Sequence, residues 1–441
     1  MDSPAAVADE TEVGSLFVAN YPPFSVWTRE AVDGVARKAL ATPAAPGVPL
    51  GLYLHIPFCR KRCHFCYFRV YTDKNAREVA DYLDTLVREW QLYADQPAIA
   101  GRPLSFVYFG GGTPSFLSIP QLQELVGGLS AVRPWKDAEE ITFECEPGTL
   151  PEGKLAAIRD LGVTRLSLGV ENFDDGVLER NGRAHRSPEI FRAWDAARAL
   201  DFPQINVDLI AGMVGETDAN WRACIDKTLE LSPDSVTIYQ MELPYNTTIS
   251  RDLLSHSGQF EGLATWATKR RWVDEAFTAL EAAGYHVGSA YTAVKDPSRT
   301  RFVYRDRLWQ GADLVGLGVA SFGHLNGVHV QNLDQWEPYS AAVKRSTIPW
   351  NRAYRPTHEE RMIRELVLQL KRGWIRPAYF REKYEVDVLS RFREPLASLE
   401  AEGYLAESGP EKVTLTRPGL LRADILLRRF FLPQHVGLRY T

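Results

Sequence analysis

Residues 51–66 read GLYLHIPFCRKRCHFC, and the fold prediction starts from this stretch. It opens with a run of large apolar and aromatic residues that is typical of a buried strand. Similar short runs recur as far as residue 240 and alternate with longer amphipathic segments. The predicted strands are Leu52–Ile56, Phe106–Phe109, Ile141–Cys145, Arg165–Val170, Ile205–Ile210 and Val236–Gln240. The predicted helices between them are Glu78–Tyr93, Ile119–Leu129, Lys154–Leu161, Glu189–Leu200 and Trp221–Leu231.

Six strands that alternate with helices are expected to pair in parallel through right-handed crossovers. We expect an α/β fold of the partial (β/α)6 TIM-like barrel type, with an open doubly wound sheet as the alternative. In both folds the chemistry lies at the C-terminal ends of the strands. The segments His55–Cys66, Gly110–Pro114, Glu144–Pro147 and Glu171 follow successive strands, so we expect them to meet at one mouth of the barrel.

Cys59, Cys63 and Cys66 have the spacing C-x3-C-x2-C. Three thiolates on one short loop can each bind a corner iron of a [4Fe–4S] cluster. The fourth iron is then open to a ligand with adjacent amine and carboxylate groups, such as the methionine end of S-adenosylmethionine (SAM). Zinc is the alternative, but it normally takes a fourth Cys or His at comparable spacing, and His64 lies between two of the ligands.

Composition excludes several classes of protein. The chain has 441 residues and a formal net charge of −5 with both signs mixed, which indicates no nucleic-acid partner. Its start is acidic and lacks the regions of a signal peptide, and no apolar run approaches ~18 residues. We therefore expect no membrane partner and a reducing, cytoplasmic location. Cys145 and Cys224 are expected to be small buried residues.

Three regions are expected along the chain. Residues 1–50 form an N-terminal tail, disordered as far as residue 20, and then a segment that wraps around the barrel. Residues 51–335 form the barrel and an extension, with a further strand at Tyr285–Ala290. Residues 336–441 form a mainly helical C-terminal α+β domain with a winged-helix-like pattern.

The cluster motif Y-x-H-I-P-F-C-x3-C-x2-C at residues 53–66 is followed by YFGGGTP at residues 108–114. Together these segments resemble the radical SAM superfamily and, within it, the oxygen-independent coproporphyrinogen III dehydrogenase-like family. The resemblance runs from about Tyr21 to the C-terminus. It includes GVENF at 169–173, NGR at 181–183, NVDLI at 206–210 and LVGLGV at 314–319.

This resemblance implies a [4Fe–4S] cluster held by the three cysteines, and SAM beside it. A glycine loop lets the backbone approach a ligand closely, and in this family it binds the amino end of SAM. Carboxylates suit an ammonium group or ribose hydroxyls, and a guanidinium suits a carboxylate, although each such residue could instead form a structural salt bridge. The implied SAM-binding residues are Gly111, Gly112, Thr113, Glu144, Arg183 and Asp208, with the aromatic ring of Tyr53 beside them.

Members of the family can hold two SAM molecules. Gln310 and Phe322 match segments near the second molecule, and Met241 lies in the matching loop after the sixth strand, with ordinary packing as the alternative. The family chemistry implies that an electron from a donor such as flavodoxin or ferredoxin enters SAM through the cluster. SAM then yields a 5′-deoxyadenosyl radical, which abstracts a hydrogen atom from carbon. Tyr53, Glu171 and Met241 are the expected catalytic residues.

Two reactions are compatible with this resemblance. In one, the radical attacks a propionate side chain of coproporphyrinogen III and carbon dioxide leaves. In the other, it attacks the methyl group of a second SAM, and the resulting methylene adds to an sp² carbon of a small molecule in C-methylation or cyclopropanation. A third function, heme transfer by a chaperone, fits less well. Chaperones of this family usually lack the N-terminal segment and carry a His-Asn pair before a Tyr-Trp, where this chain has Arg305-Asp306-Arg307-Leu308-Trp309.

Three departures from the porphyrinogen enzymes favour methyl transfer. Those enzymes typically have a fourth cysteine two residues after the motif, where this chain has Tyr67-Phe68. Those enzymes also have an N-terminal Arg-Tyr-Thr-Ser-Tyr-Pro pattern, and the matching segment of this chain, Phe17–Pro22, lacks the arginine. Glu171 of this chain stands where those enzymes usually have Gln. A tetracarboxylate substrate would need cations, so we expect an apolar or aromatic substrate instead.

Overall fold

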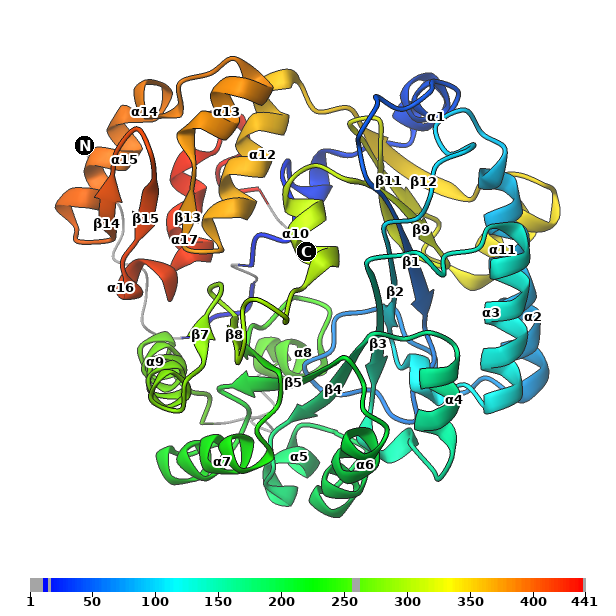
Figure 1. Ribbon diagram of the computed structural model, residues 1–441, viewed down its shortest axis with the longest axis horizontal. Helices are drawn as coiled ribbons and strands as arrows, with labels where there is room; N and C mark the ends of the chain where they lie inside the picture. Colours follow the sequence, from blue (N-terminus) through cyan, green and yellow to red (C-terminus); the bar gives the residue numbers. More distant parts are fainter. Residues whose placement is uncertain (1–10, 15–16, 256–261, 439–441) are drawn as a thin grey trace.

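The computed structural model describes residues 11–14, 17–255 and 262–438. A curved layer of strands is surrounded by helices, and a smaller, mostly helical unit lies beside it (Figure 1). Within these residues no helix is both long and apolar enough to cross a lipid bilayer.

The barrel wall confirms the six predicted strands. They are β1 (Leu50–Ile56), β2 (Phe106–Gly111), β3 (Glu140–Cys145), β4 (Arg165–Glu171), β5 (Gln204–Ala211) and β6 (Ser235–Gln240). Each pairs in parallel with the next one along the chain, as the alternation of strands and helices predicts. The connecting helices are α2 (Ala76–Ala94), α3 (Ile119–Val132), α4 (Lys154–Asp160), α5 (Asp175–Arg180), α6 (Ser187–Ala199) and α7 (Asp218–Leu231). The short α5 was not predicted.

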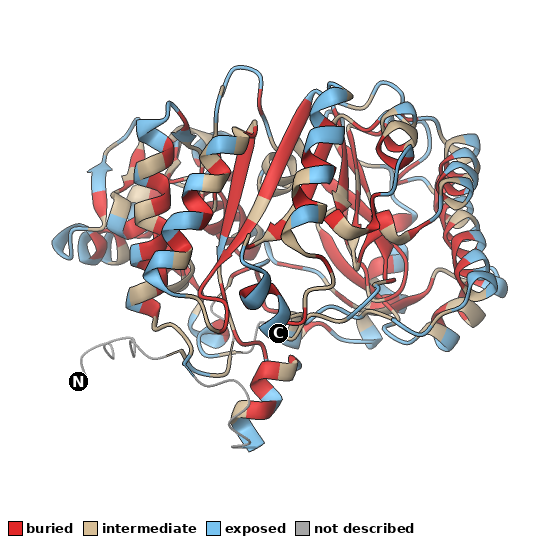
Figure 2. Ribbon diagram, turned by 90° about the horizontal axis from the view of Figure 1, so that it is seen from below, coloured by how far each residue is buried: buried red, intermediate tan, exposed pale blue. Residues whose placement is uncertain are grey.

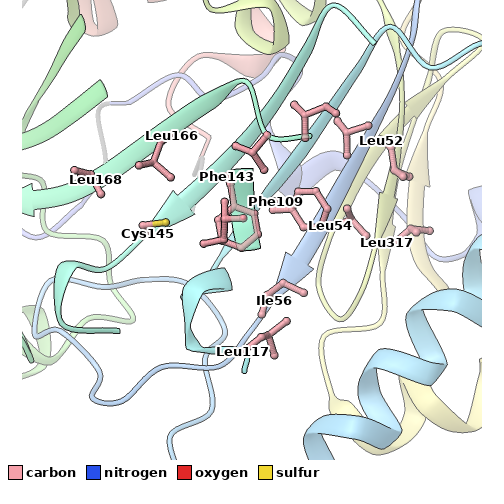
Figure 3. Packing of buried hydrophobic residues seen from close by; sticks show 14 of the residues in the cluster. Leu52, Leu54, Ile56, Phe109, Leu117, Phe143, Cys145, Leu166, Leu168 and Leu317 are labelled. Carbon is pink, nitrogen blue, oxygen red and sulfur yellow. The ribbon is translucent and has the colours of Figure 1, made fainter. Parts of the chain in front are cut away.

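Alternate residues of each strand point to opposite faces of the sheet. Leu52, Leu54 and Ile56 of β1 pack with Phe109 and Phe143 of the next strands on the helix-covered side (Figure 3). Each such side chain is at most 2% exposed, and its burial contributes roughly 1.5–3 kcal/mol. The residues between them face the inside of the barrel. These inner residues include Tyr53, His55, Tyr108, Glu144, Ser167, Asp208 and Tyr239.

The two remaining cysteines, Cys145 and Cys224, are 4% and 1% exposed and pack in the main core, which confirms them as small buried residues. Figure 2 shows the strands as mainly buried, while the outer faces of the surrounding helices are exposed. This is the distribution expected for amphipathic helices that cover a sheet.

The barrel sheet continues beyond the six predicted strands on both sides. Its order is β12-β11-β10-β9-β1-β2-β3-β4-β5-β6-β8-β7, so it ends at β12 and β7 and forms a partial barrel. The added strands are β7 (His286–Val287), β8 (Thr292–Val294), β9 (Asp313–Leu317), β10 (Phe322–Leu325), β11 (Val328–Asn332) and β12 (Trp350–Tyr354). The strand predicted at Tyr285–Ala290 is shortened to β7, because the chain turns at Gly288 to pair β7 with β8.

The position of β12 corrects one expectation about the domains. The predicted boundary between residues 335 and 336 cuts through this sheet, because β12 pairs with β11. Helix α11 (Trp336–Lys344), which follows the predicted boundary, also packs on α2. The C-terminal unit begins after Tyr354 instead.

That unit combines helices with a small antiparallel sheet, as a winged-helix-like α+β domain should. Its sheet has the order β13 (Trp374–Ile375), β15 (Val413–Leu415), β14 (Leu405–Ser408). Its helices are α12 (His358–Leu370), α13 (Pro377–Tyr384), α14 (Val388–Arg391), α15 (Arg393–Ala401), α16 (Arg417–Leu420) and α17 (Ala423–Leu426). The other α-helices in the described part of the chain are α1 (Arg37–Leu40), α8 (Thr248–Ser255), α9 (Trp266–Ala282) and α10 (Val303–Trp309).

The N-terminal segment corrects another expectation. Residues 1–10 and 15–16 lie outside the described part, but residues 17–20 do not form the disordered tail that was predicted. Val18 is fully buried, its N–H donates to Asp424, and its carbonyl accepts from Lys371. The segment thus connects the barrel to the C-terminal unit, and its apolar residues serve as core.

Candidate active site

The loop after β1 carries Cys59, Cys63 and Cys66 at the C-terminal mouth of the barrel. Thr113, after β2, donates from Oγ1 to Cys59 Sγ at 3.3 Å. Arg183, after α5, donates from Nη1 to Cys63 Sγ at 3.5 Å. Segments that are far apart in the sequence therefore converge on the cysteine loop, as the strand ends predict.

Ionised thiols would be costly here without a positively charged partner. Burial raises the pKa of Cys59 to about 11, and burial and the neighbouring Cys63 raise that of Cys66 to about 12. Iron provides such a partner, because a metal stabilises the thiolate form of its ligand. The Nε atoms of Arg62 and Arg183 are also buried without a hydrogen-bond acceptor, which suits an electron-rich group beside the loop. The residues present fit a thiolate-ligated cluster.

The zinc alternative finds little support. Nδ1 of His64 lies 2.9 Å from the carbonyl oxygen of Arg180, so only Nε2 could bind a metal, and Nε2 lies against Gly182. In the described part of the chain, no three His, Cys, Asp or Glu side chains converge as ligands of one metal ion would. A four-iron cluster does not need such convergence, because each thiolate binds a different iron.

Two residues that were not predicted, Glu146 and His185, anchor the cysteine loop through Arg60. Glu146, after β3, accepts two hydrogen bonds from Arg60, at 2.8 and 3.0 Å, and lies 3.2 Å from Nδ1 of His185. Burial alone would raise the pKa of Glu146, but the bonds from His185 and Arg60 lower it to about 2. Arg60 therefore anchors the loop through its paired hydrogen bonds to Glu146. The sequence signal that could have identified Glu146 is its position as the second carboxylate in Glu144-Cys145-Glu146, directly after β3.

The glycines after β2 pack closely against the start of the cysteine loop. A Cβ atom on Gly112 would lie 2.8 Å from the carbonyl oxygen of Ile56, and Gly111 has φ +109°. Only glycine avoids both the clash and the strain. The glycines are thus needed for the close packing of this loop on the start of the cysteine loop. The roles of Gly111, Gly112 and Thr113 at SAM remain predictions.

Glu144 lies at the end of β3 and points into the barrel. It accepts from the Tyr108 hydroxyl at 2.6 Å and from the Gly111 N–H at 3.2 Å. Burial, followed by repulsion from Asp208, raises its pKa to about 7. A carboxylate with this environment is well placed to gain a cationic partner such as the ammonium group of SAM. Tyr108 was not predicted, although it alternates with the core residues of β2.

Asp208 points into the same interior from β5. Its carboxylate accepts from Ser167 Oγ at 2.7 Å and from Asn206 Nδ2 at 2.9 Å. Burial raises its pKa. Ser167 and Asn206, on β4 and β5, orient this side chain and were not predicted. Their inward position follows from strand alternation.

Arg183 and Glu171 meet at the end of β4. Arg183 Nη2 donates to the carbonyl oxygen of Gly169 at 2.5 Å and lies 3.6 Å from Glu171 Oε1. Glu171 adopts φ +65° at a bulge in β4. Residues other than glycine rarely adopt this conformation, and those that do are often found at functional sites. Burial, together with repulsion from Asp208 and Glu144, raises the pKa of Glu171 to about 7 despite Arg183.

Tyr53 lies on β1 beside these groups. Its ring stacks on that of Tyr108 with 5.9 Å between centroids, and its hydroxyl lies 3.3 Å from Nδ1 of His55. The prediction that it borders the SAM site is consistent with this position, and the role remains a prediction.

The three residues predicted for a second SAM have contacts in three different parts of the fold. The carbonyl oxygen of Gln310 accepts from Tyr379 and Lys383 of the C-terminal unit. Phe322 packs on Phe24 and Trp27, with ring centroids 4.4 and 5.6 Å away. Met241 is buried in a cluster with Leu243, Ile249 and Phe65, among others. Their roles remain predictions.

Comparison with known proteins agrees with this geometry. Residues 53–227 match the model of the Radical SAM superfamily. The heme chaperone HemW of Escherichia coli (strain K12) is 31% identical over 278 residues, which cover 62% of this chain and 70% of the relative. An oxygen-independent coproporphyrinogen III oxidase of Pseudomonas aeruginosa is 28% identical over 398 residues, which cover 88% of this chain and 83% of the relative.

A solved structure shows the same fold. The coproporphyrinogen III oxidase HemN from Escherichia coli superposes with a TM-score of 0.81 at 24% identity, over 96% of this chain and 99% of that one. The cysteine spacing, the strand order and the relatives lead to one assignment. The chain belongs to the radical SAM superfamily and, within it, to the family that contains the oxygen-independent coproporphyrinogen III oxidases and the HemW heme chaperones.

Proposed function

We propose that this protein is an enzyme that binds SAM on a [4Fe–4S] cluster and removes a hydrogen atom from a carbon of a small molecule inside the barrel. When bound, the reduced cluster and SAM supply a 5′-deoxyadenosyl radical. The observation that carries the proposal is the convergence of three thiols, a glycine loop and inward carboxylates at one mouth of the barrel. A flavodoxin or ferredoxin is the proposed source of the electron.

The residues of the chain have distinct tasks in this proposal. Cys59, Cys63 and Cys66 hold three irons. Gly111 and Gly112 let the amino end of SAM lie against the backbone, and Glu144 accepts from its ammonium group. Asp208, oriented by its two hydrogen bonds, binds the ribose hydroxyls. The buried inner wall excludes water from the radical, which would otherwise react with its surroundings.

The relatives support oxidative decarboxylation of coproporphyrinogen III as the reaction. The oxidase of Pseudomonas aeruginosa aligns over most of both chains, and the solved oxidase has the same fold from end to end. In this reaction the radical attacks a propionate side chain. The comparisons favour this candidate over methyl transfer.

The residues of the site support methyl or methylene transfer from a second SAM as another candidate. Tyr67 and Phe68 stand where a fourth cysteine is typical, and Glu171 adds a carboxylate to an interior that already contains two others. The inner cations Arg165 and Arg183 face Glu144, Glu171 and Asp208. These five groups provide no excess positive charge for a substrate with four carboxylates, so the interior suits an uncharged substrate better. In this candidate, Gln310, Phe322 and Met241 border the second SAM.

A heme chaperone is a third candidate, because HemW is also a relative. Titration of the protein with heme measures this directly. Tight binding of about one heme per chain, together with no SAM cleavage under reducing conditions, would favour transfer of heme over catalysis.

The enzymatic candidates differ in their products. The protein is reconstituted anaerobically with iron and sulfide, and SAM, dithionite and candidate substrates are added. Decarboxylation gives 5′-deoxyadenosine and carbon dioxide. Methyl transfer gives 5′-deoxyadenosine and S-adenosylhomocysteine. With SAM deuterated in its methyl group, deuterium in 5′-deoxyadenosine supports methyl transfer, and unlabelled 5′-deoxyadenosine rejects it. Absence of any SAM cleavage by the loaded protein rejects both.

A further inference from the structure

Uncovered aromatic side chains gather near the SAM-binding carboxylates. Among the described residues, six large apolar side chains expose more than a third of their surface, and four of the six are aromatic. These four come from only two segments, the loop after Cys66 and the end of β6 with its following loop. They are Tyr67, Phe68, Tyr239 and Tyr245, which are 39%, 43%, 41% and 40% exposed.

The two segments lie side by side. Nδ2 of Asn246 donates to the carbonyl oxygen of Tyr67 at 2.8 Å, and Arg62 donates to the carbonyl oxygens of both Cys66 and Asn246. The rings of Tyr67 and Phe68 pack together with 4.5 Å between their centroids. Hydrogen bonds from the Asn246 and Arg62 side chains to backbone carbonyls therefore hold this aromatic pair beside the loop that follows β6.

Tyr239 faces the inside of the barrel. Val236 and Ile238, which alternate with it on β6, are buried in the core under the helices. Burial raises the pKa of the Tyr239 phenol, and the charges of Asp208, Glu144 and Tyr67 raise it further. Tyr239 lies next to the C-terminal end of β6, so its uncovered surface, 41% of the residue, lies at the mouth of the barrel. Glu144 and Asp208 point into the same interior from β3 and β5.

We propose that Tyr67, Phe68 and Tyr239 form the binding site for an uncharged, planar, conjugated part of the substrate. Aromatic rings bind flat π-systems by offset or edge-to-face packing, and large uncovered rings inside a protein usually mark a ligand site. This inference rests on the proposed function, because it places the planar group next to the SAM from which the radical comes.

The charges around this aromatic site exclude an anionic group. Glu144, Glu171 and Asp208 point into the same interior, and Glu242 follows β6 near Tyr67. Arg165 partly balances them, but its guanidinium stacks on Phe302, 4.1 Å from the ring centroid, at the opposite end of β4. Arg183 is engaged with Gly169 and Glu171. Arg62 is engaged with the carbonyl oxygens of Cys66 and Asn246. A carboxylate placed between the aromatic rings would therefore meet more negative than positive groups.

A matched pair of probes tests this inference. Methyl indole-2-carboxylate and indole-2-carboxylate share one planar ring system and differ in charge. Equilibrium dialysis measures their dissociation constants with the anaerobically reconstituted protein, with and without SAM. We expect the ester to bind at least about tenfold more tightly than the acid. Equal binding of the two probes, or preference for the acid, would overturn the inference.

Variants assign the binding to the proposed rings. Tyr239→Leu and Phe68→Leu should each weaken ester binding by about tenfold, whereas Tyr239→Phe, which keeps the ring, should stay within about twofold. Leu254→Ala is the matched control, because Leu254 is 58% exposed on neighbouring α8. Unchanged binding in both Leu variants would contradict the proposed site. Iron content and SAM cleavage, measured on the same samples, report separately whether the proposed function fails.

Discussion

Glu144, Glu171 and Asp208 lie on three neighbouring strands and share one interior. Burial raises the pKa of all three carboxylates, Asp208 raises that of Glu144 further, and Asp208 and Glu144 both raise that of Glu171. Their charge is tolerable only beside cations. Arg183 partly provides this for Glu171, and bound SAM would provide it for Glu144. The sequence motifs selected these residues as candidates, but that they share one interior could only be seen once the strands were in register.

Glu171 gives a prediction about pH. Its folded pKa of about 7 lies above the ordinary value of 4.5, so the protonated form is favoured in the folded state. Its contribution to stability is complete below pH 4.5 and is lost as the pH rises through 7. In cluster-free protein, Glu171→Gln should therefore become more stable relative to wild type between pH 5 and pH 8. Thermal melting of both proteins across this range checks the sign. A difference that shrinks with rising pH would contradict it.

Glu146 gives a prediction about retention of the cluster. Glu146→Gln removes the charged bonds to Arg60, each of which contributes about 1.5–3 kcal/mol, and frees one end of the cysteine loop. We expect iron to be lost to a chelator severalfold faster than from wild type. Glu189→Gln is the control, because Glu189 lies 4.0 Å from Arg60 and holds it only weakly. Equal rates in both variants would show that Glu146 does not anchor the loop.

The strands and helices of the barrel were predictable because short apolar runs and longer amphipathic segments alternate regularly along the chain. Strand runs such as Leu52–Ile56 and helices such as α2 repeat with the spacing that parallel pairing needs. The inward residues Tyr108, Ser167 and Asn206 were missed, although strand alternation contains that information. Helix α5 was missed because six residues are too few to show a helical period. The strands β10, β11 and β12 were missed because antiparallel strands follow no such rhythm.

The glycine loop after β2 allows a test at this level. Gly112→Ala places a methyl group 2.8 Å from the Ile56 carbonyl oxygen and 2.9 Å from the Pro57 backbone. The loop must shift, so we expect a loss of stability of about 1–3 kcal/mol and weaker SAM binding. Gly127→Ala on α3 is the matched control. It meets nothing within 4 Å and should stabilise the helix by up to about 1 kcal/mol. Urea unfolding of both variants checks the pair, and equal effects would contradict the steric argument.

The sequence did not predict how the N-terminal segment, the barrel and the C-terminal unit contact one another. Lys371, at the end of α12, is buried and pairs with Asp424 at 2.6 Å, and both bond to the backbone of Val18. Asp424 also accepts a short hydrogen bond from Tyr291, beside β8. The contact between Val18 and Asp424 joins residues 406 positions apart, and such contacts leave no periodic signal in the chain.

Removal of this ion pair tests its importance. Asp424→Asn leaves the Lys371 ammonium buried without its counter-charge, and we expect a loss of about 3–5 kcal/mol with a clear fall in melting temperature. Glu402→Gln is the control, because its ion pair with Arg429 lies on the surface and contributes at most about 1 kcal/mol. A smaller effect of Asp424→Asn than of Glu402→Gln would contradict the role of the pair.

The central claim is that three thiolates on the loop after β1 hold a four-iron cluster with one iron available to SAM. Electron paramagnetic resonance of the anaerobically reconstituted, dithionite-reduced protein tests it directly, together with iron and sulfide analysis. We predict about four irons and four sulfides per chain and a [4Fe–4S] signal whose g values shift when SAM is added. A protein that retains no iron and sulfide, or a cluster signal that SAM leaves unchanged, would contradict the claim.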